Sequence, residues 1–256
     1  NYQPGGVAAA FDGPLRTRFL REGRDSLGCW GWHEFGQSNR VIRVYTIYRV
    51  NNGSEFASGE NTAWSQQKRV LLQHGNDTNP RKNVMEMLIK ELAGVITKGV
   101  NVIVGGDFNK SIHSPEKMSH MMESIGLCNV FEHRLNSVKL PRTHSRGSKA
   151  VDHIWVSPYV LDHIIRAGIA PFGFMYESDH RGLYLDLDEA MLFNPDDVKI
   201  VYHDFRRLKS NIPKRVKRYM RLLTSEWKIN KVDLWHIELL ELCATSESVD
   251  QIQKKA

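Results

Sequence analysis

Three short segments of this sequence place acidic or imidazole groups directly beside apolar runs. They read GGDFN at 105–109, VDHI at 151–154 and SDH at 178–180. Each apolar run has the composition of a buried strand, so each segment puts its polar group at a strand end. Carboxylates, an amide and a histidine that meet at one edge of a sheet predict a divalent-metal phosphodiesterase site.

Asp107 and Asn109 follow an expected strand at 100–104 and two glycines, which allow a sharp turn and the close approach of a ligand. On extended backbone, residues i and i+2 project to the same side, so we expect the two side chains to act together. The Asp107 carboxylate can deprotonate a water or bind a hard cation, and the Asn109 amide can hold a phosphate oxygen or water. A solvated turn is the alternative interpretation.

Asp179 and His180 follow a loop and precede an expected strand at 183–187. A carboxylate oxygen is a hard ligand of the kind that Mg²⁺ prefers. The imidazole could stabilise negative charge on a pentavalent phosphorus, and Asp152 could accept a hydrogen bond from it and fix its tautomer. Alone, the Asp-His dipeptide is too common to indicate a function.

Tyr48, Asn51 and Arg146 are the further candidates. Tyr48 ends an expected buried strand at 41–50, with Asn51 just past it as a substrate-binding candidate. Arg146 lies in a loop at 142–149 that is rich in phosphate-type donors, and we also predict it to bind substrate. The alternatives are a core tyrosine with its hydroxyl at the rim, and an ordinary solvated loop.

The elements that must position these groups follow from the hydrophobic pattern. We expect strands at 7–11, 29–34, 41–50, 100–104, 150–157 and 183–187. We expect helices at 60–73, from the Asn79 cap to Gly99, and from Ser114 to Gly126. The mixture predicts an α+β or layered α/β class with helices packed over sheets.

Composition and charge narrow the class of protein. The chain has 256 residues, 41% of them apolar and 25% charged, which is typical of a soluble globular protein. No apolar run approaches the ~20 residues that cross a bilayer, and no signal peptide is visible at Asn1, so we expect no membrane partner. Three distant cysteines predict a reducing compartment, intracellular and by function nuclear.

A shift in composition near residue 190 predicts two parts. Residues 1–190 would form the main domain, and 191–256 a basic helical extension. Between Phe205 and Arg221 there are eight Lys or Arg residues and no acidic residue. With a net charge of +6 for the whole chain, this pattern favours a nucleic-acid partner.

Taken in order, the motifs resemble the endonuclease/exonuclease/phosphatase superfamily, which has the DNase I-like fold. The resemblance covers about residues 5–190 and depends on GGDFN, on RGSKAVDHIWVS at 146–157 and on SDHRGL at 178–183. It implies a four-layer α/β/β/α sandwich. Within the superfamily, the chain is most similar to the endonuclease domains of non-LTR retrotransposons. By that analogy the basic tail would lead toward a reverse transcriptase domain in the parent polyprotein.

The resemblance also implies the site residues. Its catalytic set comprises Tyr48, Asp107, Asn109, Asp152 and His180. In this set Asp107 activates the water, Asn109 holds the phosphate, and Asp152 is paired with His180. The implied metal ligands are Asp107, Asn109 and Asp179, with Mg²⁺ as the cofactor and Mn²⁺ as the alternative.

The chain departs from the family pattern at its start. The family opens with a strand that bears an asparagine and a strand that bears a metal-binding glutamate, and neither has a counterpart here. Glu22 and Glu34 do not stand in the expected place. We therefore expect an N-terminally truncated sandwich that lacks its first strands, with weakened affinity for Mg²⁺.

Three functions compete at this point. The first is a Mg²⁺-dependent phosphodiesterase, a retroelement DNA endonuclease that directs in-line attack of water. The second is a non-catalytic nucleic-acid-binding or interaction fragment of the same fold. The third, ranked lowest, is the same fold acting on a small phosphorylated substrate, such as an inositol phosphate, or on a phospholipid.

Overall fold

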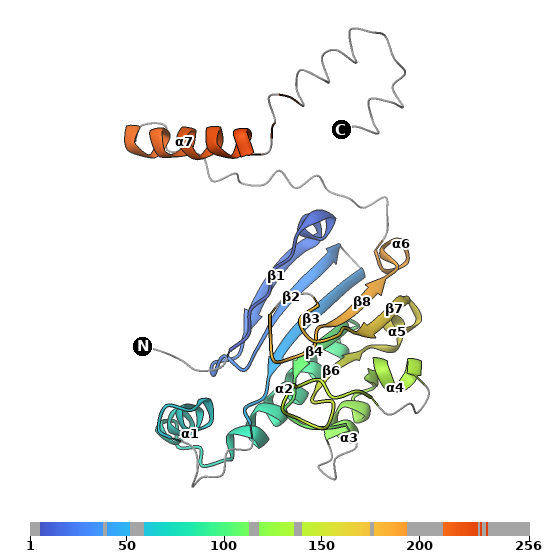
Figure 1. Ribbon diagram of the computed structural model, residues 1–256. Helices are drawn as coiled ribbons and strands as arrows, with labels where there is room; N and C mark the ends of the chain where they lie inside the picture. The colour runs from blue at the N-terminus through green and yellow to red at the C-terminus, as the bar shows by residue number, and fades with distance from the viewer. Residues whose placement is uncertain are drawn as a thin grey trace. The chain divides into compact units, whose positions relative to one another are not determined.

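A six-stranded sheet is the central element of the fold (Figure 1). The computed structural model describes residues 6–37, 40–51, 59–112, 118–135, 140–174, 177–193, 212–229, 231 and 234. The strands are β1 (Phe19–Arg24), β2 (Trp30–Gln37), β3 (Arg40–Tyr48), β4 (Asn101–Asp107), β5 (Cys128–Asn129) and β6 (Asp152–Val156). They lie in the order β1-β2-β3-β4-β6-β5, and the β3–β4 pair is parallel whereas the others are antiparallel.

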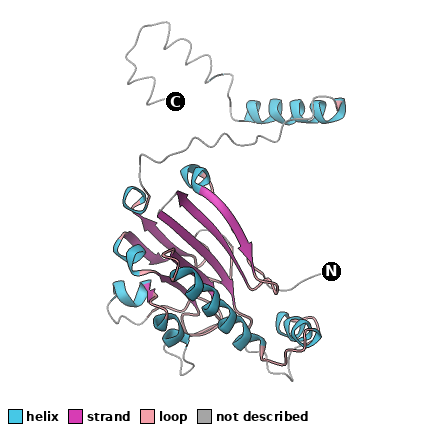
Figure 2. Cartoon of the chain, turned by 180° about the vertical axis from the view of Figure 1, so that it is seen from behind, coloured by secondary structure: helices cyan, strands magenta, loops and turns pink. Residues whose placement is uncertain are grey.

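Three helices contribute to the core on one face of this sheet, and Figure 2 shows α2 running across that face. They are α1 (Ala63–Gln73), α2 (Pro80–Ile96) and α3 (Met118–Ser124). As predicted, Asn79 caps α2, because its side chain accepts a hydrogen bond of 2.9 Å from the Arg81 amide. The apolar stripe of α2 buries Leu88 and Leu92 completely in a core shared with β4 and β6. This core fixes the strands that carry the site.

A smaller sheet covers part of the opposite face. It pairs β7 (Ile164–Ile169) with β8 (Leu183–Leu187), and Leu183, Leu185 and Leu187 pack against a second core in the large sheet. Short helices α4 (Val130–Leu135), α5 (Pro158–Asp162) and α6 (Glu189–Leu192) complete this part. Helices, a large sheet and a small sheet therefore lie in successive layers, and the predicted α+β class is confirmed.

Most of the predicted elements are present with changed ends, but the strand predicted at 7–11 is wrong. Residues 6–12 have no regular secondary structure and lead into a 3-10 helix, η1 (Gly13–Arg18). Phe11 packs its ring on Phe19 and Phe35, each at 5.2 Å between ring centroids. Aromatic contacts of Phe11, and not a strand ladder, therefore attach the end of this segment to the sheet. The start of the helix predicted from Ser114 lies outside the described residues.

The chain divides into two units, Asn1–Ile200 and Val201–Ala256. In the second unit the structure describes α7 (Pro213–Ile229), none of whose residues is buried. Its apolar residues recur at helical spacing, and its lysines and arginines lie mainly on the opposite side. The predicted boundary near residue 190 stays a prediction. Within the described ranges, no helix combines the length and apolarity needed to cross a bilayer.

Candidate active site

Tyr48, Asp107 and Asp152 form a row across three adjacent strands. Tyr48 is paired with Asp107 between β3 and β4, and Asp107 is paired with Asp152 between β4 and β6. Paired residues of neighbouring strands project side by side from the same face of a sheet. The strand ends thus bring one phenol and two carboxylates together.

Gly106 allows β4 to hold Asp107 in this register. Its φ is 145°, and a Cβ there would lie 2.0 Å from the carbonyl oxygen of Ile47 on β3. An L side chain rarely adopts that conformation and would have no room. One of the two glycines before Asp107 is therefore required by the approach of the neighbouring strand.

The turn after β4 folds Asn109 back onto Asp107. The backbone amide of Asn109 donates to Asp107 Oδ1 at 2.7 Å, and its side-chain Nδ2 donates to Oδ2 at 2.9 Å. The prediction that extended backbone aligns these side chains is wrong, because Asn109 has a φ of 47° in the left-handed region. They meet through an Asx-type turn instead, a conformation that asparagine tolerates.

A buried arginine, which sequence reasoning missed, braces this turn. Arg81 donates to the carbonyl oxygens of Val50 and Asn109, the latter at 3.2 Å, and its side chain is 4% exposed. Asn109 Nδ2 also donates to the carbonyl oxygen of Arg49 at 2.7 Å. These contacts tie the end of β3, the start of α2 and the turn into one unit. The available signal was an arginine directly after the proline that starts α2.

His180 is held by Asp152. Its Nδ1 lies 2.9 Å from Asp152 Oδ2 and 3.1 Å from Oδ1, so Nδ1 carries the proton and donates it to the carboxylate. Asp152 is 10% exposed and His180 is 28% exposed. The carboxylate therefore fixes the tautomer of an imidazole whose Nε2 remains directed away from it.

A loop residue, Thr143, forms hydrogen bonds to the backbone beside both members of this pair. Thr143 is fully buried, and its Oγ1 accepts hydrogen bonds from the amides of Val151 at 2.9 Å and Asp152 at 3.1 Å. Its carbonyl oxygen accepts from the Arg181 amide at 2.8 Å. Sequence reasoning treated 142–149 only as a donor-rich loop and missed this role.

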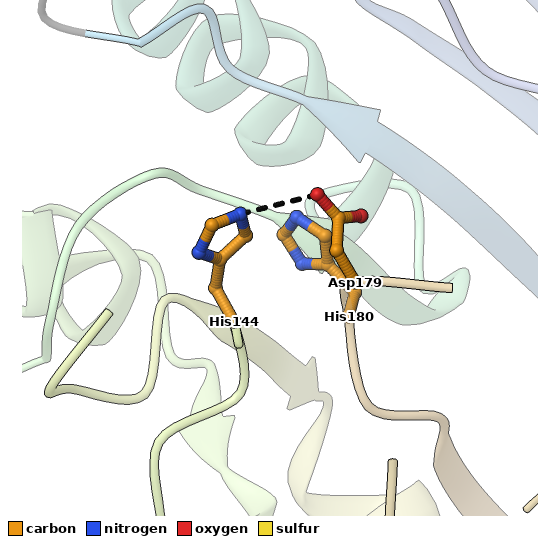
Figure 3. Close-up of side chains that lie close together, drawn as sticks. All are labelled: His144, Asp179 and His180. Carbon is orange, nitrogen blue, oxygen red and sulfur yellow. Dashed lines mark ion pairs between the residues drawn. The ribbon is translucent and has the colours of Figure 1, made fainter. Parts of the chain in front are cut away.

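Asp179 and His144 lie beside His180 (Figure 3). His144 Nε2 is 3.3 Å from Asp179 Oδ2, and the rings of His144 and His180 lie 4.8 Å apart between centroids. Potential ligand atoms of His144, Asp179 and His180 all lie within 4.8 Å of one another. Such a set could hold a divalent cation, and its two imidazoles would suit a transition metal better than Mg²⁺.

Burial and neighbouring charges set the protonation of the site. Burial raises the pKa of Asp107 to about 6; the Asn109 amide opposes this rise, and the negative charge of Asp152 adds to it. For His180, burial works against the charged form, but the hydrogen bond and charge of Asp152, with Asp107 and Asp179, raise its pKa overall. Burial, and next the charge of Asp107, raise the pKa of the Tyr48 hydroxyl. The site thus combines a titratable base with an imidazole whose charged form is favoured and a phenol whose protonated form is favoured.

Asn51 and Arg146, the two predicted substrate-binding residues, lie exposed near this constellation. Asn51 follows the end of β3, and Arg146 contacts the site through its backbone amide, which donates to His144 Nδ1 at 3.2 Å. Their contacts with substrate stay predictions. The other candidates, Tyr48, Asp107, Asn109, Asp152, Asp179 and His180, are brought together as described.

Comparison with solved structures finds nucleases and phosphatases. The chain is similar to the 3' phosphatase NExo from Neisseria bound to product DNA hairpin, with 16% identity and a TM-score of 0.43. It is similar to the APE2 catalytic domain of Xenopus laevis, with 13% identity and a TM-score of 0.45. A third match is an endonuclease/exonuclease/phosphatase family protein from Leptotrichia buccalis, with 14% identity and a TM-score of 0.35. These neighbours belong to the superfamily that the motifs resemble.

The extent of these matches is partial. They cover 61%, 62% and 62% of this chain, and the chain spans 64%, 56% and 52% of the three matched chains in the same order. No protein-family model and no curated protein matches the sequence. Because all three TM-scores are below 0.5, a function has to be supported by the side-chain geometry.

Proposed function

We propose that this chain carries the catalytic site of a divalent-metal-dependent phosphodiesterase. The observation that supports it is the convergence of two sheet-borne carboxylates, Asp107 and Asp152, with a carboxylate-held imidazole, His180, and the exposed carboxylate of Asp179. Burial and the nearby charge of Asp152 raise the pKa of Asp107, which is how active sites tune a general base.

Each residue has a defined part in hydrolysis. Asp107 accepts the proton of the attacking water; both of its oxygens already accept one hydrogen bond, and each keeps a further lone pair. Asp152 keeps His180 oriented, so that its Nε2–H can donate to a phosphate oxygen as charge develops there. The Tyr48 hydroxyl, kept protonated, is a further donor on the same row.

The donor set fits a divalent cation. Asp179 is 61% exposed, and beyond the oxygen that faces His144 it has lone pairs for a hard ion. We propose that Asp179 and Asp107 hold Mg²⁺ or Mn²⁺ together with water. When bound, such an ion would neutralise charge on the phosphate and on the leaving oxygen.

For the substrate, we propose DNA, cleaved internally as by a retroelement endonuclease. The support is the order of the three motifs in the sequence and the excess of basic residues in 191–256. A reverse transcriptase domain in the parent polyprotein, and a nuclear site of action, follow from the same analogy.

Nicking of supercoiled plasmid by the full chain tests the proposal. We expect nicking that depends on Mg²⁺ or Mn²⁺ and falls by about 10²–10⁴-fold in Asp107→Ala, since that is the usual contribution of a general base. Asp162→Ala, which removes an exposed carboxylate on α5, is the matched control and should keep full activity. Equal nicking by native chain and Asp107→Ala would end the idea. Hydrolysis of a soluble phosphomonoester without plasmid nicking would favour a phosphatase.

A second function is favoured by α7. Lys214, Lys217, Arg218 and Arg221 lie exposed on this helix, and phosphate neutralisation by such residues releases counterions. A non-catalytic nucleic-acid-binding chain would bind DNA with strong salt dependence and would not nick it. DNA affinity that is unchanged between low and high salt would exclude this function.

A further inference from the structure

His144 lies in a loop that is tied to the Asp179–His180 segment through the backbone. The Ser145 amide donates to the Asp179 carbonyl oxygen at 2.8 Å, and His144 and His180 form an isolated antiparallel bridge. Figure 3 shows the His144 ring beside the Asp179 carboxylate and the His180 ring. The loop therefore holds its imidazole at a fixed place next to both residues.

The tautomer of His144 is determined by its neighbours. The backbone amide of Arg146 donates to His144 Nδ1 at 3.2 Å, and a backbone amide cannot act as an acceptor. Nδ1 must then present its lone pair, so the proton of the neutral ring lies on Nε2. Nε2, which carries that proton, lies 3.3 Å from Asp179 Oδ2.

Asp179 lacks the anchoring that the other two carboxylates have. Asp107 accepts two hydrogen bonds from Asn109, and both oxygens of Asp152 lie within 3.1 Å of His180 Nδ1. Asp179 is 61% exposed, and within the described ranges His144 is the side chain found at hydrogen-bonding range of its carboxylate. An exposed side chain without such a contact keeps its rotamer freedom and loses it only on binding a ligand.

We propose that His144 is a positioning residue for Asp179: its Nε2–H holds the carboxylate in the orientation that receives the cation. This inference deepens the proposed function and depends on it for the cation. Two other roles compete with it. His144 could itself be a metal ligand, because one of its ring nitrogens lies within 4.8 Å of potential ligand atoms of both Asp179 and His180. It could also serve only as an edge-on packing partner of the His180 ring, given the 71° between the ring planes.

Two substitutions separate these roles. His144→Gln keeps an N–H donor near the position of Nε2 and removes the ring, whereas His144→Phe keeps the ring and removes the donor. His120→Gln, at a histidine on α3 with 77% side-chain exposure, is the control. Direct Mn²⁺ binding, followed by the electron paramagnetic resonance of the free ion, should weaken about 3–10-fold in His144→Phe and less than about threefold in His144→Gln, as expected for one hydrogen bond.

Other patterns would overturn the inference. Equal loss of Mn²⁺ affinity in both variants, with a larger loss for Zn²⁺, would make His144 a ligand. Full affinity in His144→Phe with a loss in His144→Gln would make it a packing residue. A nitrogen-15 spectrum of the metal-free chain that shows the proton of His144 on Nδ1 would contradict the assigned tautomer.

A final readout keeps this inference separate from the proposed function. Three-bond couplings across χ1 of Asp179, measured without metal, report whether its side chain occupies one rotamer. We expect one rotamer in the native chain and in His144→Gln, and averaging in His144→Phe. Averaging in the native chain would refute the positioning role even if the enzyme is active. A single rotamer that is lost in His144→Phe would support it even if no Mn²⁺ binds.

Discussion

The two halves of the candidate site are held in different ways. Tyr48, Asp107 and Asp152 lie on paired positions of β3, β4 and β6, and a buried arginine braces the turn that follows Asp107. Asp179 and His144 lie on two loops joined by a few backbone hydrogen bonds, and the Asp179 carboxylate is 61% exposed. The half on the sheet has its geometry fixed by the core, whereas the loop half depends on individual contacts.

This difference suggests a division of work. In the proposed mechanism Asp107 and Tyr48 on the sheet, with the His180 imidazole that Asp152 holds, handle protons, because burial and neighbouring charges shift their pKa values. The loop-borne carboxylate meets solvent, where a hydrated cation can arrive and leave. Changes in the sheet half should therefore abolish the chemistry, and changes in the loop half should alter metal dependence.

After Asp107→Ala, the largest effect is expected from Asp152→Asn. An amide at this position can turn its N–H₂ toward His180 Nδ1, which would favour the wrong tautomer of the imidazole. We expect the nicking rate to fall about 10²–10³-fold, within the usual range for a disrupted acid–base group. Asp186→Asn, which removes an exposed ion pair with Arg166, is the control. A loss shared by both variants would point to folding instead of catalysis.

A smaller and recoverable effect is expected from Asp179→Asn. Loss of one carboxylate should weaken binding of the cation, so we expect a rate about 10-fold lower at limiting Mg²⁺, equivalent to about 1.4 kcal/mol. Raising the Mg²⁺ concentration should restore most of the rate. A deficit that stays constant at every metal concentration would mean that Asp179 is not a ligand.

The pH profile should show both limbs of an acid–base site. Because Asp107 acts as a base, the rate should fall about 10-fold for each pH unit below the pKa of its carboxyl, which burial raises to about 6 and the charge of a bound cation would lower again. The rate should fall again once His180 loses its proton, at a pH above the usual value for histidine. Because Asp107 and His180 interact, the two apparent pKa values of the profile describe the pair and not either residue alone. A rate that does not fall in acid above the pH at which the chain unfolds would contradict the role of Asp107.

The same shift makes a stability prediction. The pKa of Asp107 is raised in the folded state, so the stabilisation from its neutral form is fully present below the unfolded value of 3.8 and is lost as the pH rises through about 6. Asp107→Asn should therefore lose less stability at pH 8 than at pH 4. Urea unfolding of both chains at the two pH values measures this, and an equal difference at both would contradict it.

The smallest effect is expected from Asn109→Gly. Glycine accepts the positive φ at this position, but two side-chain hydrogen bonds to Asp107 and to the Arg49 carbonyl oxygen are lost. We expect the free energy of unfolding to fall by about 1 kcal/mol, measured by urea denaturation. An unchanged stability would show that the turn is held by its backbone and Arg81 alone.

The sequence could predict the sheet-borne half because strand ends are visible in it. Hydrophobic runs at 41–50 and 100–104 place Tyr48 and Asp107 at the ends of β3 and β4, and α2 starts at its predicted cap. Strand β1 was missed, because charged residues at positions 21, 22 and 24 hide its pattern and pairing with β2 overrides local propensity. Residues 19–24 therefore form a strand because they pair with β2, and not because of their local sequence.

The loop-borne half could not be predicted in the same way. That His144 faces Asp179 depends on a bridge between segments more than thirty positions apart, and no local pattern specifies such pairing. The left-handed backbone of Asn109 was likewise not anticipated, although asparagine after a Gly-Asp turn is a typical carrier of that conformation.

A double-mutant cycle on plasmid nicking tests most directly whether these residues form one site. Asp107→Asn, His180→Gln and the double variant would be compared with the native chain under saturating metal. Groups that act as one unit are strongly non-additive, so the double variant should be about as slow as the slower single variant. Losses that multiply, or single variants that nick DNA like the native chain, would contradict a shared catalytic site.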